Sequence, residues 1–131
     1  MECYTEGNFI LHSGEKSNYL FDVLKLINNG EFIQNVWDFL EKDSPLVGIE
    51  FGGAILASIV FIDDFSIIRK DGTIYGEIPN NYTLFDDVVT TENSIKTAIE
   101  QIGKEPKKIK CVVDRRKTET LKIESMLKWK Q

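Results

Sequence analysis

The chain has 131 residues, of which 42% are hydrophobic and 28% are charged, and its formal net charge is −5. This length is enough to bury one hydrophobic core and too short for two ordinary domains, so we expect a single domain spanning residues 1–131. The negative charge repels polyanions at long range, which argues against a nucleic-acid partner or an anionic-membrane surface. A phosphate-bearing ligand must therefore be held by local contacts.

Cysteine usage and hydropathy bear on where the protein works. Cys3 and Cys111 lack the CxxC spacing of a metal or redox site, so idle or buried thiols are expected rather than a disulfide. No apolar run approaches the length of a membrane span, and residues 1–6 lack the basic and apolar regions of a secretory signal. We expect a soluble, cytoplasmic protein without a membrane partner.

The first half of the chain predicts a hairpin, two helices and two strands. Residues 9–21 interleave apolar residues with a polar turn, as a hairpin does. Residues 31–41 carry apolar side chains at helical spacing, and residues 46–49 form a short apolar strand. Residues 54–62 are apolar on every side, which is typical of a helix buried against a sheet, and residues 65–68 predict another strand.

The second half continues the alternation after a polar stretch. Residues 69–81 contain two glycines and a proline, and their length is uncommon for a structureless connection, so a functional loop is expected. A strand is predicted at 82–85, and apolar residues at helical spacing over 95–102 predict a helix closed by a glycine. A strand at 109–113 and a last helix at 121–129 complete the prediction.

This alternation of strands and helices predicts the fold class. It favours an α/β fold with an open, mainly parallel sheet flanked by helices. Ligands of such sheets bind at the carboxyl ends of the strands. The loops after Ile49, Phe85 and Val113 therefore form the candidate site.

The strongest local signal is an acidic pair, a threonine-rich turn and a helix start. Asp86 and Asp87 end a predicted strand, Thr90 and Thr91 follow, and the helix opens near Asn93. Backbone N–H groups at a helix N-terminus bind phosphate, and carboxylates just before it accept hydrogen bonds from sugar hydroxyls. The pattern fits a phosphorylated sugar, and on spacing alone it fits a strand end and a capped helix equally well.

Five segments, in this order along almost the whole chain, resemble the type I phosphoribosyltransferases. LFDDVVTTENS (84–94) resembles their phosphoribosyl-diphosphate motif. FILHSGEKSNYLF (9–21), GIEFGGAILA (48–57), Arg69-Lys70 and Val113-Asp114-Arg115 resemble the orotate phosphoribosyltransferase branch. The resemblance implies the type I phosphoribosyltransferase fold, with a minimal hood over the site.

The same resemblance implies a reaction and its ligands. The 5-phosphoribosyl group of phosphoribosyl diphosphate would pass to orotate, giving orotidine 5-phosphate and diphosphate, as in pyrimidine nucleotide biosynthesis. Mg²⁺ would be bound mainly through diphosphate and ribose hydroxyls, with no metal ligand set in the protein. The family also implies a homodimer in which the loop beginning at Arg69 reaches the neighbouring site.

Residue roles carry over from the family in the same way. Asp86 and Asp87 would hold the ribose, and Arg69 and Lys70 would neutralise diphosphate. Phe21 would pack on the base, and Arg115 would bind the carboxylate or carbonyl groups of the pyrimidine. The implied substrate-binding residues are Phe21, Glu50, Phe51, Gly52, Gly53, Thr90, Thr91, Glu92, Asn93, Ser94 and Arg115.

Four positions depart from the cationic pattern of the family. Thr73 stands where the mobile loop carries a catalytic lysine, and Tyr75 where it usually has histidine, while His12 and Gly52 replace lysines found in some members. Each lost charged hydrogen bond corresponds to about 1.5–3 kcal/mol, or one to two orders of magnitude in rate or affinity. The alternative is thus a catalytically impaired nucleotide-binding or regulatory protein on the same fold.

Glu92 departs further, because the family nearly always has glycine there. A carboxylate at this place repels the 5-phosphate or occupies the backbone amides itself, and a positive φ would strain the backbone. We hypothesise that Glu92 weakens phosphate capture; the alternative is a turn that has shifted outward. Two further alternatives stay open, Phe21 as ordinary core and Arg115 with Arg116 as a solvated pair. If Phe21 and Arg115 both pointed away from the pocket, transfer to another base would be favoured.

Overall fold

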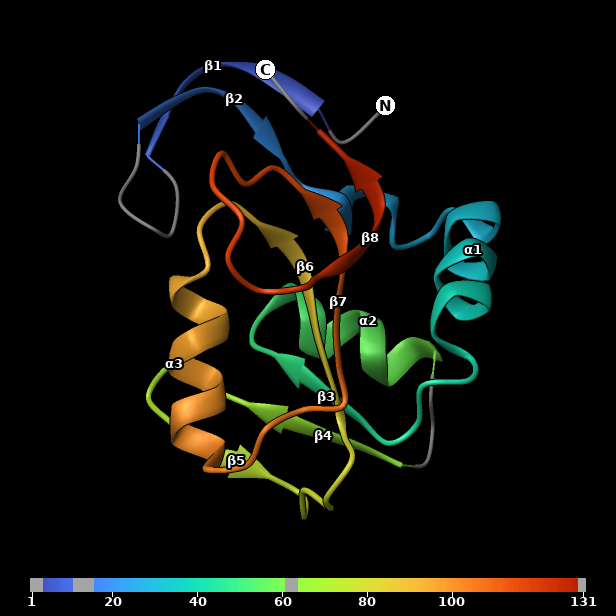
Figure 1. The fold of residues 1–131 in the computed structure, drawn as a ribbon. Helices are drawn as coiled ribbons and strands as arrows, with labels where there is room; N and C mark the ends of the chain where they lie inside the picture. The colour runs from blue at the N-terminus through green and yellow to red at the C-terminus, as the bar shows by residue number, and fades with distance from the viewer. Residues whose placement is uncertain (1–3, 11–15, 61–63, 130–131) are drawn as a thin grey trace.

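The computed structural model of the chain describes residues 4–10, 16–60 and 64–129 (Figure 1). Its main element is a six-stranded sheet with strand order β5-β4-β3-β6-β7-β8, in which all neighbours run parallel except β4 and β5. The strands are β3 (Leu46–Ile49), β4 (Phe65–Ile68), β5 (Ile74–Tyr75), β6 (Thr83–Val89), β7 (Lys108–Asp114) and β8 (Glu124–Lys128). The expected α/β fold with an open, mainly parallel sheet is confirmed.

Helices pack on both faces of this sheet. The helices are η1 (Val23–Leu26, a 3-10 turn), α1 (Gly30–Leu40), α2 (Gly52–Val60) and α3 (Asn93–Ile102). Phe85 belongs to the core that α1 and α2 cover, whereas its neighbour Leu84 belongs to the core under α3. Successive residues of β6 therefore point to opposite faces, as the period of a strand requires.

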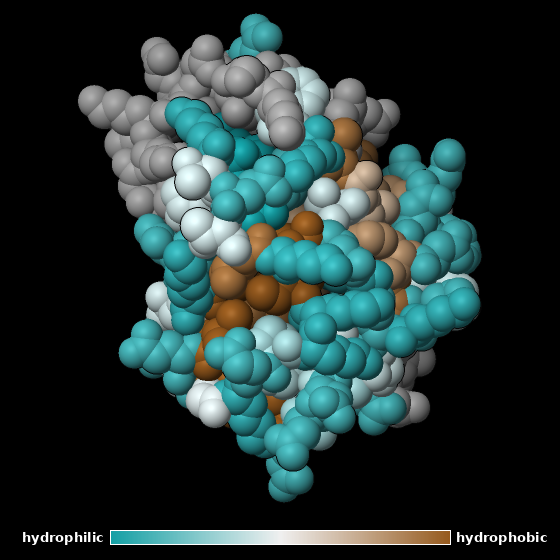
Figure 2. All heavy atoms as spheres, viewed as in Figure 1, coloured by the Kyte–Doolittle hydropathy of each residue, from teal (hydrophilic) through white to brown (hydrophobic). Residues whose placement is uncertain are grey.

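The face under α3 is only partly covered. Within the described residues α3 is the single helix there, and Figure 2 shows hydrophobic atoms visible between α3 and β7, surrounded by hydrophilic residues. None of the helices in the described ranges is both long and apolar enough to cross a membrane.

The N-terminal segment forms the expected hairpin. β1 (Tyr4–Ile10) and β2 (Lys16–Phe21) pair antiparallel, with Tyr4 opposite Phe21. In Figure 1 this hairpin lies at the end of the sheet where β6 and β7 finish. His12 and Cys3 lie outside the described residues, whereas Cys111 is a buried free thiol, as expected.

The helix predicted over residues 121–129 is wrong, because this segment contains strand β8. β8 pairs in parallel with β7, and the N–H of Trp129 donates to the carbonyl of Asp114 at 2.8 Å. Leu127 packs against the core under α1 and α2, whereas Ile123 packs against the core under α3. The apolar residues of this segment, which contact both layers from β8 and from the residues just before it, imitate helical spacing, and this explains the error.

Residues 69–81, predicted as a functional loop, contain strand β5. Ile67 pairs with Tyr75 and Ile68 with Ile74, so the chain turns back on β4. The N–H of Arg69 donates to the carbonyl of Thr73 at 2.8 Å and closes this turn.

A buried ion pair lies at the end of the sheet where the parallel strands begin. Asp43, just before β3, is 3% exposed, and its carboxylate is 2.5 Å from the ammonium of Lys110 on β7. Burial alone would raise the pKa of Asp43, but the contacts with Lys110 and Lys108 outweigh it and lower that pKa. The pair connects β7 to the segment that enters β3.

Candidate active site

The strand order places the candidate site between β3 and β6. From β3 the chain passes through α2 to β4 on one side, and from β6 it passes through α3 to β7 on the other. The connections thus diverge between β3 and β6, and ligands of open parallel sheets bind at the carboxyl ends of the strands at such a point. The turn 50–53 follows β3, and residues 90–94 follow β6, so the two predicted loops meet there.

The turn after β3 packs directly on β6. A Cβ atom on Gly53 would lie 2.5 Å from the carbonyl oxygen of Phe85, so only glycine allows this approach. Both Gly52 and Gly53 are buried, whereas Phe51 at the head of the turn is 60% exposed. The backbone of this turn therefore lies beside the acidic pair.

Asp86 and Asp87 lie within β6, which extends beyond its predicted end to Val89. Asp86 is 7% exposed, and its Oδ1 accepts a hydrogen bond from the N–H of Asp87 at 2.8 Å. Burial, followed by the charge of Asp87, raises the pKa of Asp86 well above its ordinary value, while Lys70 acts in the opposite direction. Asp87 is more exposed, and its Oδ1 accepts from the N–H of Val88 at 2.8 Å.

Cationic groups follow β4 at the same edge of the sheet. Nε of Arg69 donates to the Glu50 carboxylate at 3.0 Å, and the N–H of Lys70 donates to the same carboxylate at 3.4 Å. Glu50, followed by Tyr75, raises the pKa of Arg69 through side-chain hydrogen bonds. Glu50, Arg69 and Lys70 are therefore brought together, and Glu50 orients Arg69.

Residues 90–94 connect β6 to the N-terminus of α3. Thr90 and Thr91 are half-buried, Asn93 and Ser94 are exposed, and the N–H of Asn93 donates to Thr91 Oγ1 at 3.4 Å. Glu92 is the N-cap residue, with φ −89° and no capping hydrogen bond from its side chain. The backbone strain considered for Glu92 is thus absent.

The Glu92 side chain instead binds the connection between β7 and β8. It is buried, its Oε2 accepts from the N–H groups of Thr120 (2.7 Å) and Leu121 (3.0 Å), and the Thr120 hydroxyl donates to Oε1. Nη1 of Arg116 donates to Oε2 at 2.7 Å, and Lys96 lies 3.5 Å away. Burial opposes ionisation, but these hydrogen bonds outweigh it and lower the pKa of Glu92.

Arg115 and Arg116 are both buried, so the alternative interpretation of them as a solvated pair is wrong. The N–H of Arg115 donates to the carbonyl of Val89 at 2.9 Å, which connects the ends of β7 and β6. Arg116 is 5% exposed, and its Nε and Nη2 donate to the two Asp114 oxygens at 3.0 and 2.8 Å. Sequence reasoning assigned no site role to Asp114 or Arg116; the available signal was an acidic residue at the end of β7, followed two residues later by a basic one.

The remaining predicted residue, Phe21, is the last residue of β2 on the hairpin, and its side chain lies outside the part of the chain that the structure describes. Within the described ranges, no group of three or more His, Cys, Asp or Glu side chains is arranged to hold a metal ion.

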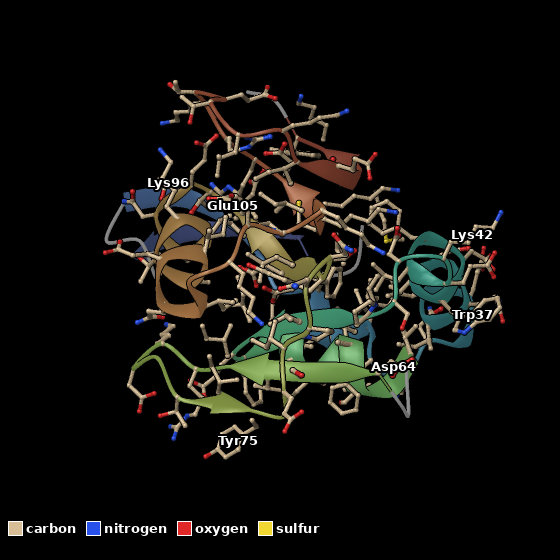
Figure 3. The ribbon with its side chains drawn as sticks, turned by 60° about the horizontal axis from the view of Figure 1, so that its bottom comes forward. Trp37, Lys42, Asp64, Tyr75, Lys96 and Glu105 are labelled. Atoms are coloured by element: carbon tan, nitrogen blue, oxygen red, sulfur yellow. The ribbon has the colours of Figure 1, made fainter. Side chains whose placement is uncertain are left out.

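A hollow of about 610 Å³ lies elsewhere, between α1 and the end of α2. Ile27, Trp37 and Ile59 are among its lining residues, and Figure 3 shows Trp37 on the outer side of α1. Its lining, as far as the structure describes it, has no charged side chain that would bind a phosphate ester. The carboxyl edge of the sheet therefore remains the candidate site.

Comparisons with known proteins agree with this geometry. No protein-family model matches the sequence. The chain is 33% identical over 133 residues to the orotate phosphoribosyltransferase of Methanocaldococcus jannaschii, covering 86% of this chain and 76% of the relative. It is 32% identical over 136 residues to the orotate phosphoribosyltransferase of Pyrococcus abyssi, covering 86% of this chain and 75% of that relative.

Solved structures share the fold. The orotate phosphoribosyltransferase of Aeropyrum pernix superposes with a TM-score of 0.75 at 22% identity, over 97% of this chain and 88% of its own. The adenine phosphoribosyltransferase of Trypanosoma brucei superposes with a TM-score of 0.64 at 13% identity, over 86% of this chain and 71% of its own. The fold is that of the type I phosphoribosyltransferases, and the chain belongs to the orotate phosphoribosyltransferase family.

Proposed function

We propose that the chain transfers a 5-phosphoribosyl group from phosphoribosyl diphosphate to orotate, giving orotidine 5-phosphate and diphosphate. The observation that carries this proposal is the contact between the turn at Gly52 and the acidic pair on β6, at the point where the strand connections diverge. The family relationship supports the choice of reaction.

The roles follow from where charge develops during the transfer. The C1 centre of the ribose becomes positive as diphosphate leaves, so carboxylates near the ribose and cations near diphosphate stabilise the transition state. Asp87, the more exposed carboxylate, would accept hydrogen bonds from ribose hydroxyls, and Asp86 would support it from the interior. Arg69 and Lys70 would bind diphosphate.

Thr90, Thr91, Asn93 and Ser94 would bind the 5-phosphate. They surround the N-terminus of α3, where backbone N–H groups and the helix dipole favour an anion. Arg115 would bind the carboxylate of orotate, because a guanidinium pairs with a carboxylate through two parallel hydrogen bonds. Phe21 would pack on the base.

The residues present fit Mg²⁺ as a cofactor that arrives with the substrate. Mg²⁺ is usually held by one or two carboxylates together with substrate phosphates, so it would be bound here mainly through diphosphate and the ribose hydroxyls, with the half-buried carboxylate of Asp87 beside the ribose. When bound, Mg²⁺ would neutralise the charge that develops on diphosphate. We also propose that the protein works in the cytoplasm as a homodimer, and sedimentation as a monomer would contradict the dimer.

A second candidate is a binding or regulatory protein that has lost turnover. Thr73 and Tyr75 favour it, because neither supplies the cation that the family places in this loop. Such a protein would be stabilised by orotidine 5-phosphate against heat without consuming substrates, since a ligand of the native state stabilises it by mass action.

The deciding experiment follows the near-ultraviolet absorbance of orotate in the presence of phosphoribosyl diphosphate and Mg²⁺. The enzyme lowers this absorbance, Asp87→Asn does not, and Glu100→Gln on the exposed side of α3 behaves as the native protein does. Constant absorbance with a raised melting temperature would favour the binding protein.

A further inference from the structure

Glu92 occupies a place in the phosphate-binding turn, yet its carboxylate binds a different segment. Its hydrogen-bond donors among the described residues are Arg116, Thr120 and Leu121, all beyond β7. Its charge is balanced by the buried Arg116 and by Lys96.

The segment that Glu92 binds connects two parallel strands without a helix. Parallel strands are usually joined through a helix, which satisfies its own backbone groups. Residues 115–123 have no helix, so their N–H groups need other partners. Glu92 supplies an acceptor for two of them, at Thr120 and Leu121.

The beginning of this segment is anchored at the candidate site. The N–H of Arg115 donates to the carbonyl of Val89, and Arg116 forms ion pairs with both Asp114 and Glu92. At the other end, Glu119 pairs with Lys128 of β8 at 2.8 Å. Arg115 is therefore placed by a segment whose fold depends on Glu92.

We propose that Glu92 is a positioning residue, which holds the segment 115–121 against the N-terminus of α3 and so places Arg115 to recognise the carboxylate of the acceptor base. This rests on the proposed function. It also replaces the hypothesis that Glu92 weakens phosphate capture: the carboxylate is paired and acts on the acceptor side of the site.

The first test asks whether Glu92 holds the segment. In Glu92→Gln the side chain presents an amide to the donors of Arg116, so backbone hydrogen exchange should rise at Thr120 and Leu121. Asp43→Asn is the matched control, because it breaks a buried ion pair where the parallel strands begin. If backbone hydrogen exchange in residues 115–121 is no faster in Glu92→Gln than in Asp43→Asn, the proposal is overturned, whether or not the protein is an enzyme.

The second test separates positioning from stability. We expect Glu92→Gln to raise the KM for orotate about tenfold or more, equivalent to about 1.4 kcal/mol, with the KM for phosphoribosyl diphosphate within about threefold of native. Asp43→Asn should leave both KM values near native. Equal rises of both KM values, or an unchanged KM for orotate, would contradict the positioning role.

Failure of the proposed function gives a different result. The native protein would then leave orotate unconsumed, and calorimetric titration with orotidine 5-phosphate would take the place of the KM. Weaker binding by Glu92→Gln, with faster exchange at Thr120 and Leu121, would still support the positioning role. Unchanged or absent binding in both proteins would overturn it.

Discussion

Gly52 leaves space for the carboxylate of Asp87. A Cβ atom at Gly52 would lie 2.0 Å from Asp87 Oδ2, closer than any real contact, so a larger residue there and the observed Asp87 rotamer exclude each other.

The first prediction is that Gly52→Ala displaces Asp87. The substitution should lower kcat/KM about 10- to 100-fold and cost about 1–3 kcal/mol of stability, because the added methyl group overpacks a buried contact. Gly30→Ala is the control, since a Cβ there meets nothing within 4 Å, and it should be neutral or slightly stabilising. Steady-state kinetics and urea unfolding measure both effects; native kinetics in Gly52→Ala would contradict the prediction.

The second prediction concerns the buried Asp86. Its pKa is raised by burial and by Asp87, so the folded protein binds a proton more tightly than the unfolded chain, and stability falls as pH rises above 3.8. Asp86→Asn should therefore be more stable than native at pH 7, by about 0.5–2 kcal/mol, while losing turnover. This difference in stability between Asp86→Asn and the native protein should vanish near pH 3.8. Urea unfolding at both pH values measures this, and a variant less stable at pH 7 would refute it.

Local patterns predicted much of the fold. Strands 46–49 and 65–68 and the helix ending before Gly103 are found as expected, because apolar periodicity and a left-handed glycine cap are local signals. β8 was mispredicted because its pairing with β7 is a non-local interaction. β6 was predicted too short because acidic residues are rare in strands, and here two of them lie inside one.

The candidate site was predictable as a place but not in its contacts. The order of elements predicted that the loops after Ile49, Phe85 and Val113 share one edge of the sheet, and the loops after the parallel strands β3, β6 and β7 do so, although β6 ends at Val89. The pair of Glu92 with Arg116 depends on the register that sets Val89 beside Asp114. That register is fixed by packing of the whole sheet, which no short segment of sequence specifies.

The third prediction concerns acid stability. The pKa of Glu92 is lowered in the folded protein, so its ionised form contributes stability that is present above the unfolded value of 4.5 and lost as pH falls below it. Glu92→Gln should cost about 3 kcal/mol at pH 7, because Arg116 is left buried without this partner, and much less at pH 3. Denaturant unfolding from pH 3 to 7 measures the difference, and a cost independent of pH would contradict it.

The fourth prediction concerns the half-buried pair of Arg69 and Glu50. Arg69→Gln should raise the KM for phosphoribosyl diphosphate about 10- to 100-fold, since a cation for diphosphate is lost. Glu50→Gln keeps an acceptor for Arg69 and removes a negative charge, so the same KM should fall a few fold. Neither change should alter the melting temperature appreciably, because an ion pair that remains accessible to solvent contributes little. A raised KM in Glu50→Gln would show that its charge is needed to orient Arg69.

The last prediction addresses the missing loop cation. Thr73 lies at the end of a turn that is closed by a hydrogen bond from the N–H of Arg69 to the carbonyl of Thr73. The Thr73 side chain is exposed, so a longer side chain at this position meets no packing constraint. If catalysis is limited by this lost charge, Thr73→Lys should raise kcat about 10- to 100-fold at saturating substrates. Thr73→Gln matches the length without the charge and should leave kcat unchanged. Equal rates in all three proteins would mean that Arg69 and Lys70 already supply the charge that the leaving diphosphate requires.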